Sequence, residues 1–214
     1  MEITYWSDFA CPFCYIGSTR LKRALKDLGM EGTKLEFKSF QLDPEAPEET
    51  KDKYLNHFTH GIKELEPRAK KQMTNIANMA KEEGLEFNIF DVVPVNTMSA
   101  HRLFKLAENK YSADVADNLI HRFYHIYFVE GKSIADNQVL KAAALASGLS
   151  ETDIDEVLTS DKFEDEVLED RKELEAFGVN GVPFFVINNK YAISGAQPYD
   201  VFINALKKIS AEES

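Results

Sequence analysis

The feature that most constrains this chain is a pair of cysteines two residues apart, placed where a β-rich run gives way to a helical pattern. Cys11 and Cys14 are the only two cysteines among 214 residues. Residues 3–6 before them are β-rich and apolar, and apolar residues after them recur at helical spacing over 21–28 until Gly29. The sequence therefore predicts a strand followed by a helix, with both cysteines on the first turn of that helix.

A helix start suits thiol chemistry, because its unpaired N–H groups and macrodipole favour a thiolate, which is the nucleophile. We expect Cys11 to be exposed and to attack, and Cys14, one turn further, to be more buried and to resolve the mixed disulfide. Pro12 suits an early helical position, and Phe13 adds an uncharged apolar neighbour. Two intervening residues let the sulfurs meet across one turn, so a small disulfide ring can open and close with little backbone movement.

Composition narrows the possible partners and the compartment. A formal net charge of -11 argues against nucleic acid or an anionic membrane surface as a partner, since both require clustered Lys and Arg. No apolar run approaches the roughly 18 residues of a membrane span, and Met1 is followed directly by the first strand rather than by a signal segment. Two cysteines in a reducing compartment are more readily catalytic or metal-binding than structural. We therefore expect a cytoplasmic protein.

The remaining pattern divides into a helical stretch flanked by strands. Residues 34–40 alternate charged and apolar side chains as a half-exposed strand does, and the lysines in it favour a sheet edge. A proline-marked connector begins near Asp43. Helical periodicity then dominates, and after a helix at 160–178 the runs 184–187 and 191–194 form a predicted β-hairpin before a last helix from Pro198. The predicted helices between these parts cover residues 67–84, 96–107, 116–127 and 136–148, with a short one from 150.

This order of elements resembles the thioredoxin fold with an inserted all-helical domain, as in the DsbA family. The resemblance covers essentially the whole chain. The resemblance implies an α/β fold in which residues 1–42 and 161–214 form a discontinuous thioredoxin-like domain and residues 43–160 form the insertion. Within the family the chain looks most like the FrnE-like branch. The motifs that carry this likeness are Asp8 before Cys11, Asn96-Thr97, Ala100-His101-Arg102-Leu103, the run from Gly178 to Phe185, and Ser194-Gly195-Ala196-Gln197.

What the resemblance implies is a dithiol–disulfide oxidoreductase or isomerase that acts on protein or small-molecule disulfides. Cys11 would be the nucleophile and Cys14 the resolving thiol, with no cofactor beyond their own disulfide and with glutathione as a possible electron donor. The dipeptide Pro12-Phe13 lacks the histidine of the periplasmic members. We therefore do not expect this chain to share the strongly oxidising reduction potential of those members. The oligomeric state is left open.

Further site residues follow from the resemblance and from local chemistry. Pro183 opens an apolar strand and is expected to be cis beside the cysteines, because only X-Pro bonds adopt cis cheaply. Val182 before it would offer backbone groups to an extended substrate. The remaining candidates are Phe13 and His101 for substrate binding, and Asp8, Pro12, Asn96 and Arg102 for catalytic support. An ordinary loop proline, a strand-ending Asp8 and a surface His–Arg pair are the simpler alternatives.

Other functions compete with this one. The cysteines could form half of a zinc site completed by His57 and His60, although the spacing is unlike that of most structural zinc sites, and we predict no metal. Glutathione-dependent isomerases and transferases of the 2-hydroxychromene-2-carboxylate isomerase and kappa type share the insertion, but they usually have serine at the first position and lack the second cysteine. A redox-switched binding protein is the non-enzymatic alternative.

Overall fold

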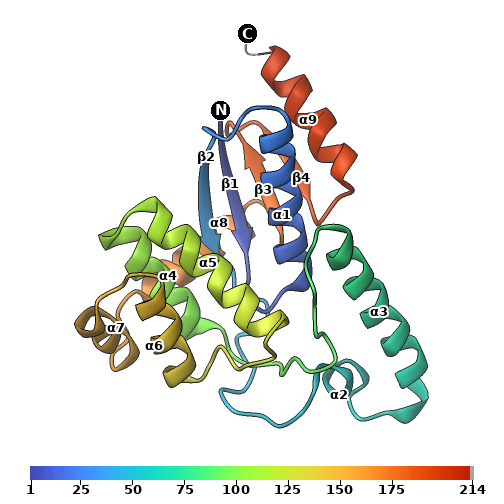
Figure 1. Cartoon of the computed structure of the whole chain (residues 1–214), viewed down its shortest axis with the longest axis vertical. Helices are drawn as coiled ribbons and strands as arrows, with labels where there is room; N and C mark the ends of the chain where they lie inside the picture. The colour runs from blue at the N-terminus through green and yellow to red at the C-terminus, as the bar shows by residue number, and fades with distance from the viewer. Residues whose placement is uncertain (213–214) are drawn as a thin grey trace.

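A four-stranded mixed sheet forms the centre of the upper part of the molecule (Figure 1). The computed structural model describes residues 1–212. Strands β1 (Glu2–Ser7) and β2 (Lys34–Ser39) pair in parallel, and β3 (Phe184–Ile187) pairs antiparallel with both β1 and β4 (Tyr191–Ser194). The order is β2-β1-β3-β4, so β2 lies at an edge and the C-terminal strands form a hairpin, as predicted.

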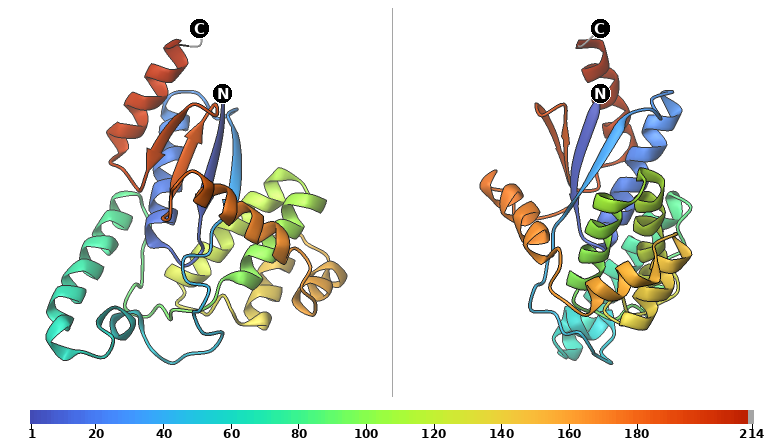
Figure 2. Two further views of the ribbon diagram at one scale, coloured as in Figure 1. Left: turned by 180° about the vertical axis from the view of Figure 1, so that it is seen from behind. Right: turned by 90° about the vertical axis from the view of Figure 1, so that its left-hand side faces the viewer.

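Helices cover both faces of this sheet. Helices α1 (Pro12–Asp27) and α9 (Tyr199–Glu212) pack together on one face, and α8 (Glu164–Ala176) packs on the other face against β1 and β2 (Figure 2). Side chains of β1 alternate accordingly. Tyr5 points into the core with α1, whereas Trp6 packs on the α8 side with Leu174.

The segment between β2 and α8 is helical and lies beyond the carboxyl ends of β1 and β2 (Figure 1). Local sequence starts several of its helices, because the side chains of Ser112, Asp136 and Ser150 accept hydrogen bonds from the first backbone N–H groups of α5, α6 and α7. The elements are α2 (Tyr54–Thr59), a 3₁₀ turn at Lys63–Leu65, α3 (Glu66–Glu82), α4 (Met98–Lys110), α5 (Ala113–Phe128), α6 (Asn137–Ala146) and α7 (Glu151–Leu158).

Aromatic packing joins the sheet to the helical segment. The ring of Phe9, just after β1, stacks on Phe37 of β2 at a centroid distance of 5.3 Å and meets Phe123 of α5 edge-on at 5.2 Å. Phe37 in turn contacts Phe104 of α4 at 4.5 Å. One apolar core therefore runs through both parts of the chain.

Two predicted features differ from the structure. The helix expected from Ser160 begins at Glu164, because Phe163 adopts a left-handed backbone conformation (φ 69°) that a helix cannot include. Phe177 falls at the apolar spacing of Phe163, Val167 and Leu174, which predicts a buried side chain, but it is 64% exposed. No helix within residues 1–212 has the length and apolar character needed to cross a bilayer.

Candidate active site

Both cysteines lie at the start of α1, where the sequence predicts them. Cys11 is the residue that precedes the helix, with an extended backbone (φ −94°), and Pro12 is the first helical residue. Both thiols are free, so the structure describes the dithiol form. Cys14 is fully buried, as expected, but Cys11 is only 4% exposed, because connector and helical side chains surround the site. The expectation of an exposed Cys11 is therefore wrong.

The surroundings of Cys14 move the pKa of its thiol in opposite directions. Burial raises the pKa of the Cys14 thiol well above its ordinary value, and a hydrogen bond with Cys11 and the charge of Cys11 raise it further. A hydrogen bond from the Ser7 side chain and one from the Asp8 backbone N–H, 3.5 Å from Cys14 Sγ, lower the pKa. The resolving thiol is thus held protonated in the dithiol form, and the Asp8 N–H already donates to its sulfur.

The loop at Val182 and Pro183 lies against the first cysteine. The Val182–Pro183 peptide bond is cis, and Cys11 Sγ donates to the Val182 carbonyl at 3.7 Å. The Pro183 carbonyl accepts from the Gly195 N–H at 2.8 Å. Gly17 on α1 permits the close approach of this loop, since a Cβ there would lie 3.0 Å from Pro183 Cγ.

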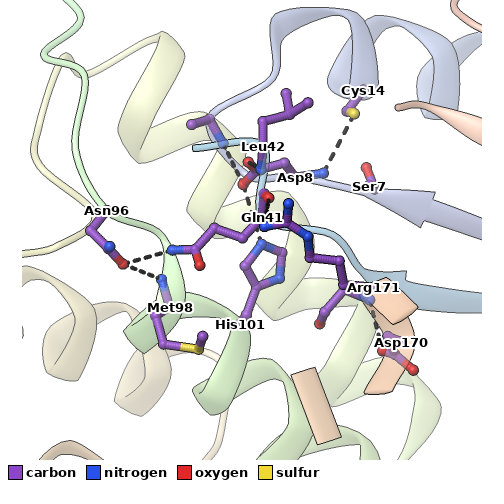
Figure 3. A network of polar contacts seen from close by, with 12 residues as sticks. Ser7, Asp8, Cys14, Gln41, Leu42, Asn96, Met98, His101, Asp170 and Arg171 are labelled. Atoms are coloured by element: carbon purple, nitrogen blue, oxygen red, sulfur yellow. Dashed lines mark hydrogen bonds and ion pairs between the residues drawn. The ribbon is translucent and has the colours of Figure 1, made fainter. Parts of the chain in front are cut away.

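Asp8 connects the strand that delivers the dithiol to the connector and to the insertion (Figure 3). Its carboxylate accepts from the Leu42 N–H at 2.8 Å and the Ala10 N–H at 3.3 Å, and it lies 3.2 Å from His101 Nε2. A carboxylate only accepts, so Nε2 carries the proton in this contact. The other ring nitrogen of His101, Nδ1, is buried and has no partner within residues 1–212.

His101 and Arg102 therefore take roles other than the expected ones. His101 is fully buried behind Asp8, so in this conformation it cannot touch a substrate, and its ring contacts the Asp8 carboxylate instead. Arg102 donates to backbone carbonyls of Val157, Ser160 and Lys162 after α7 and lies away from the dithiol. It fixes the end of a helix and gives no support to the cysteines.

Asn96 holds the connector that follows β2 (Figure 3). Its side-chain oxygen accepts from Gln41 Nε2 at 2.8 Å and from the Met98 N–H at 2.9 Å, and its Nδ2 donates to the Pro44 carbonyl at 3.0 Å. Asn96 thus supports the site indirectly, by positioning the segment that covers it.

A cavity of about 280 Å³ opens beside Cys11, and sequence reasoning missed most of it. Phe13, a predicted substrate-binding residue, lines it next to Cys11. The cavity is mainly apolar, and its charged lining residues are both acidic, with no Lys or Arg among the residues of the described chain that line it. Apolar side chains from the connector, α2, α3 and the segment before α4 complete the wall, namely Leu42, Tyr54, Phe58, Ile76 and Val95. The one sequence feature that could have indicated this part of the lining was the apolar Leu42 at the start of a polar connector.

The residues of the zinc alternative do not assemble into a ligand set. His57 lines the cavity beside Cys11, but His60 does not; His60 lines a second hollow, which His57 also borders. Within residues 1–212, no group of three or more His, Cys, Asp or Glu side chains is placed to hold a metal ion. Trp6 is part of the core, and its indole N–H donates to the Asp170 carbonyl at 2.9 Å.

Comparison with known proteins gives a family for this fold and site. Residues 2–207 match the family model described as a DSBA-like thioredoxin domain. The uncharacterised protein YwbO of Bacillus subtilis is 27% identical over 210 residues, which cover 96% of each chain. The crystal structure of a "probable DsbA oxidoreductase", SCO1869 from Streptomyces coelicolor, is 32% identical with a TM-score of 0.91, covering 100% of this chain and 92% of that one.

Two more distant structures share the fold alone. A 2-hydroxychromene-2-carboxylate isomerase is 16% identical with a TM-score of 0.73, over 100% of this chain and 98% of that one. The cytosolic disulfide reductase DsbM from Pseudomonas aeruginosa, solved with glutathione, is 17% identical with a TM-score of 0.65, over 99% of this chain and 100% of that one. Both agree with the predicted thioredoxin-like fold carrying helices between its strands.

Proposed function

Because the chain belongs to the DSBA-like thioredoxin domain family of thiol–disulfide oxidoreductases, we propose that it exchanges disulfides of protein or small-molecule substrates through Cys11 and Cys14. The observation that carries this proposal is the dithiol itself. Two free cysteines lie on the turn that starts α1, where the Cys14 backbone N–H donates to the Cys11 carbonyl at 3.1 Å. The finer assignment to the FrnE-like branch rests on the sequence motifs.

The exchange proceeds by two displacements at sulfur. The Cys11 thiolate attacks a substrate disulfide, a bond forms between Cys11 and one substrate sulfur, and the other substrate sulfur leaves as a thiolate. Cys14 then loses its proton and attacks Cys11 Sγ, which releases the second substrate thiolate and leaves the Cys11–Cys14 disulfide. The substrate gains two electrons and the protein dithiol loses two. The reverse sequence oxidises a substrate dithiol.

We propose that a substrate lies across Cys11 with the loop at Val182 on one side and the apolar cavity on the other. Cys11 is common to both, since it contacts the Val182 carbonyl and lines the cavity. Backbone groups of the loop suit an extended chain. The cavity suits an uncharged apolar group next to the substrate sulfur, and its size, near the lower end of the roughly 300–1,000 Å³ typical of ligand pockets, suits one side chain.

A second thiol must return electrons to the ring when the protein acts as a reductase. Glutathione is our candidate, on the analogy of the DsbM structure that contains it. We also propose a cytoplasmic location, because the chain has no cysteines outside the dithiol and so needs no oxidising compartment to complete its fold.

The glutathione-dependent isomerase class is the second candidate, favoured only by the shared fold. A resolving thiol argues against it, because Cys14 lies on the same helix turn as Cys11, where it would attack any adduct formed on Cys11. A redox-switched binding protein would have the same dithiol but would not turn over.

The test is to trap the intermediate and measure turnover. Incubated with oxidised insulin chains, Cys14→Ser is expected to accumulate mixed disulfides that dithiothreitol releases, while Cys11→Ser accumulates none, because only the former keeps the attacking thiol without its resolver. Wild type should catalyse insulin reduction. Equal trapping by both variants would reverse or abolish the assigned roles, and trapping without turnover would favour the binding protein.

A further inference from the structure

Arg20 of α1 is a buried cation whose guanidinium has partners on two other segments of the chain. Its Nε donates to Glu83 Oε1, directly after α3, at 2.8 Å. Its Nη1 donates to the carbonyls of Ala196 and Gln197, in the turn after β4, at 3.0 and 3.1 Å. One side chain therefore joins the helix that begins at the dithiol to the inserted segment and to the turn after β4.

The turn after β4 is bonded in its own right to the loop that contacts the first cysteine. Gly195, next to Ala196, donates its backbone N–H to the Pro183 carbonyl at 2.8 Å. The preceding carbonyl of that loop, from Val182, accepts from Cys11 Sγ at 3.7 Å. A continuous series of hydrogen bonds and one peptide link therefore leads from the guanidinium to the sulfur that we expect to attack the substrate.

Steric contact brings the turn and the loop to the same point of α1. A Cβ on Gly17 would lie 3.0 Å from Pro183 Cγ and 3.5 Å from Ala196 Cα. Such contact limits how closely the turn can approach, but it does not fix the orientation of the turn. The guanidinium does fix this orientation, because its donors form a rigid planar fork that the two carbonyls and the Glu83 carboxylate occupy together.

The acidic partner of Arg20 is buried as well. The side chain of Glu83 is 2% exposed, and its Oε2 lies 3.2 Å from Arg23 Nη2. Because two guanidinium groups share this carboxylate, Arg20 can be replaced without leaving a buried charge unpaired. Helix α3, which ends next to Glu83, also supplies Ile76 to the wall of the cavity beside Cys11. The same cation thus contacts the segments on both sides of the dithiol.

We propose that Arg20 is a positioning residue for substrate binding, which holds the loop at Val182 and Pro183 in place beside Cys11. The proposal rests on the proposed disulfide exchange, in which backbone groups of this loop pair with an extended substrate. It predicts an effect confined to substrates that are long enough to reach the loop. A compact disulfide needs only Cys11, so its reaction should not depend on Arg20.

The experiment compares a long with a compact disulfide, both of them uncharged. Reduced protein is mixed with the homodisulfide of acetyl-Ala-Ala-Cys-Ala-Ala-amide or with bis(2-hydroxyethyl) disulfide. Second-order rate constants come from the appearance of the substrate thiol, separated by chromatography after an acid quench. Hydrogen exchange of the Gly195 amide, followed by NMR, reports its bond to Pro183 directly. The variant is Arg20→Gln, and Arg102→Gln is the matched control, because Arg102 is also buried and donates to backbone carbonyls but lies away from the dithiol.

We expect Arg20→Gln to react about tenfold more slowly with the peptide disulfide and at the wild-type rate with bis(2-hydroxyethyl) disulfide, because the turn after β4 loses its hydrogen bonds to a charged group. Its Gly195 amide should exchange faster. Arg102→Gln should keep the wild-type ratio of the two rates and the wild-type exchange.

A wild-type ratio in Arg20→Gln, or a lowered ratio with unchanged exchange at Gly195, would overturn the proposal. Should Arg20→Gln fail to fold, Arg20→Lys decides by the same ratio. Lysine keeps a cation beside Glu83 but has no planar fork to reach both carbonyls, so it should also lower the ratio. Failure of wild type to react with either disulfide would instead refute the proposed function.

Discussion

At the scale of single residues, the cavity beside Cys11 is distinguished by its lack of positive charge. The charged residues that line it are two acidic side chains, Asp8 and Asp43, and no Lys or Arg of the described residues is among the lining. Two apolar side chains of this lining, Leu42 and Phe58, are left exposed to solvent. Exposed apolar surface at a cavity mouth is typical of a binding site. We therefore expect the site to prefer apolar over acidic groups beside the substrate disulfide.

The first prediction concerns Phe58, which is 38% exposed at this mouth. Reduced wild type should react about tenfold faster with the homodisulfide of acetyl-Cys-Phe-amide than with that of acetyl-Cys-Glu-amide, because burying an aromatic side chain is worth more than one factor of ten. Phe58→Arg should reduce or reverse this ratio. Second-order rate constants from thiol release measure both effects.

The matched control for this prediction is Phe90→Arg. Phe90 is 45% exposed and lies outside the cavity, so the same change of charge and shape should leave the ratio as in wild type. Equal rates for the two peptides in wild type, or equal changes in the two variants, would show that the cavity does not select the substrate.

The sequence predicted the position of a site residue correctly where that position depends only on residues adjacent to it in the chain. The placement of Cys11, Cys14 and Pro183 followed from a strand end, a helix start and a strand start. His101 and Arg102 were assigned to the site from a local motif, but their burial and their contacts with Asp8 and with the residues after α7 depend on segments distant in sequence. Beyond Asp8, Cys11, Pro12 and Phe13, the lining of the cavity was not predicted, since its wall comes from several segments that meet only in the folded chain.

At the scale of elements, the packing of α1 against the loop at Pro183 decides how the dithiol is presented. Gly17, one turn after Cys14, is where the helix and the loop approach most closely. A Cβ at this position would lie 3.0 Å from Pro183 Cγ and 3.3 Å from the Phe185 ring, which is fully buried. Neither neighbour can move without shifting the strand that begins at Phe184.

The second prediction is that Gly17→Ala destabilises the protein, although Gly→Ala inside a helix usually stabilises by about 0.4–1 kcal/mol. Overpacking of a rigid contact costs typically 1–3 kcal/mol, so the clash outweighs the helix gain. Urea unfolding should show the loss, and insulin reduction should slow because the loop moves from Cys11. Gly32→Ala, where an added Cβ meets nothing within 4 Å, is the control. A Gly17→Ala variant as stable and as active as wild type would contradict the argument.

Two helix starts with a capping side chain, those of α6 and α7, were predictable, whereas α5, which Ser112 also caps, begins three residues before the predicted start. The side-chain oxygens of Asp136 and Ser150 accept the expected backbone hydrogen bonds at α6 and α7. The start of α8 was misplaced by several residues because the turn that precedes it depends on the positive φ of Phe163, which is a phenylalanine and gives no turn signal. A glycine at that position would have marked the boundary.

At the scale of the whole molecule, charged and aromatic contacts couple the sheet to the inserted helices. The carboxylate of Asp170 on α8 accepts from the Ser39 N–H at 2.8 Å, from Lys105 Nζ of α4 at 2.7 Å and from Lys38 Nζ of β2 at 3.2 Å. The rings around Phe9 form a second bridge on the other face of β1. We therefore propose that the predicted division into residues 43–160 and the remainder describes the topology, while both parts unfold together.

The last prediction tests this coupling with two probes and one substitution. Trp6, the only tryptophan, is buried on the sheet, so its fluorescence reports the thioredoxin-like part, while far-UV circular dichroism reports mainly the helices. Leu140→Ala removes a fully buried side chain from α6, far from Trp6 in the topology, and should cost about 2–5 kcal/mol. If the molecule is one cooperative unit, the urea midpoints of both unfolding curves should fall by the same amount, and the two curves should remain coincident.

Leu145→Ala provides the control on the same helix, because Leu145 is 42% exposed and the identical truncation should move neither probe appreciably. A shift of the circular dichroism transition in Leu140→Ala with an unchanged Trp6 midpoint would mean that the inserted helices unfold independently. The contacts of Asp170 and Phe9 would then link two separately stable parts. In that case the cavity beside Cys11, whose wall comes largely from the inserted segment, would be lost while the dithiol stayed folded. The preference for the Phe peptide over the Glu peptide would then disappear at a lower urea concentration than the reaction of Cys11 itself.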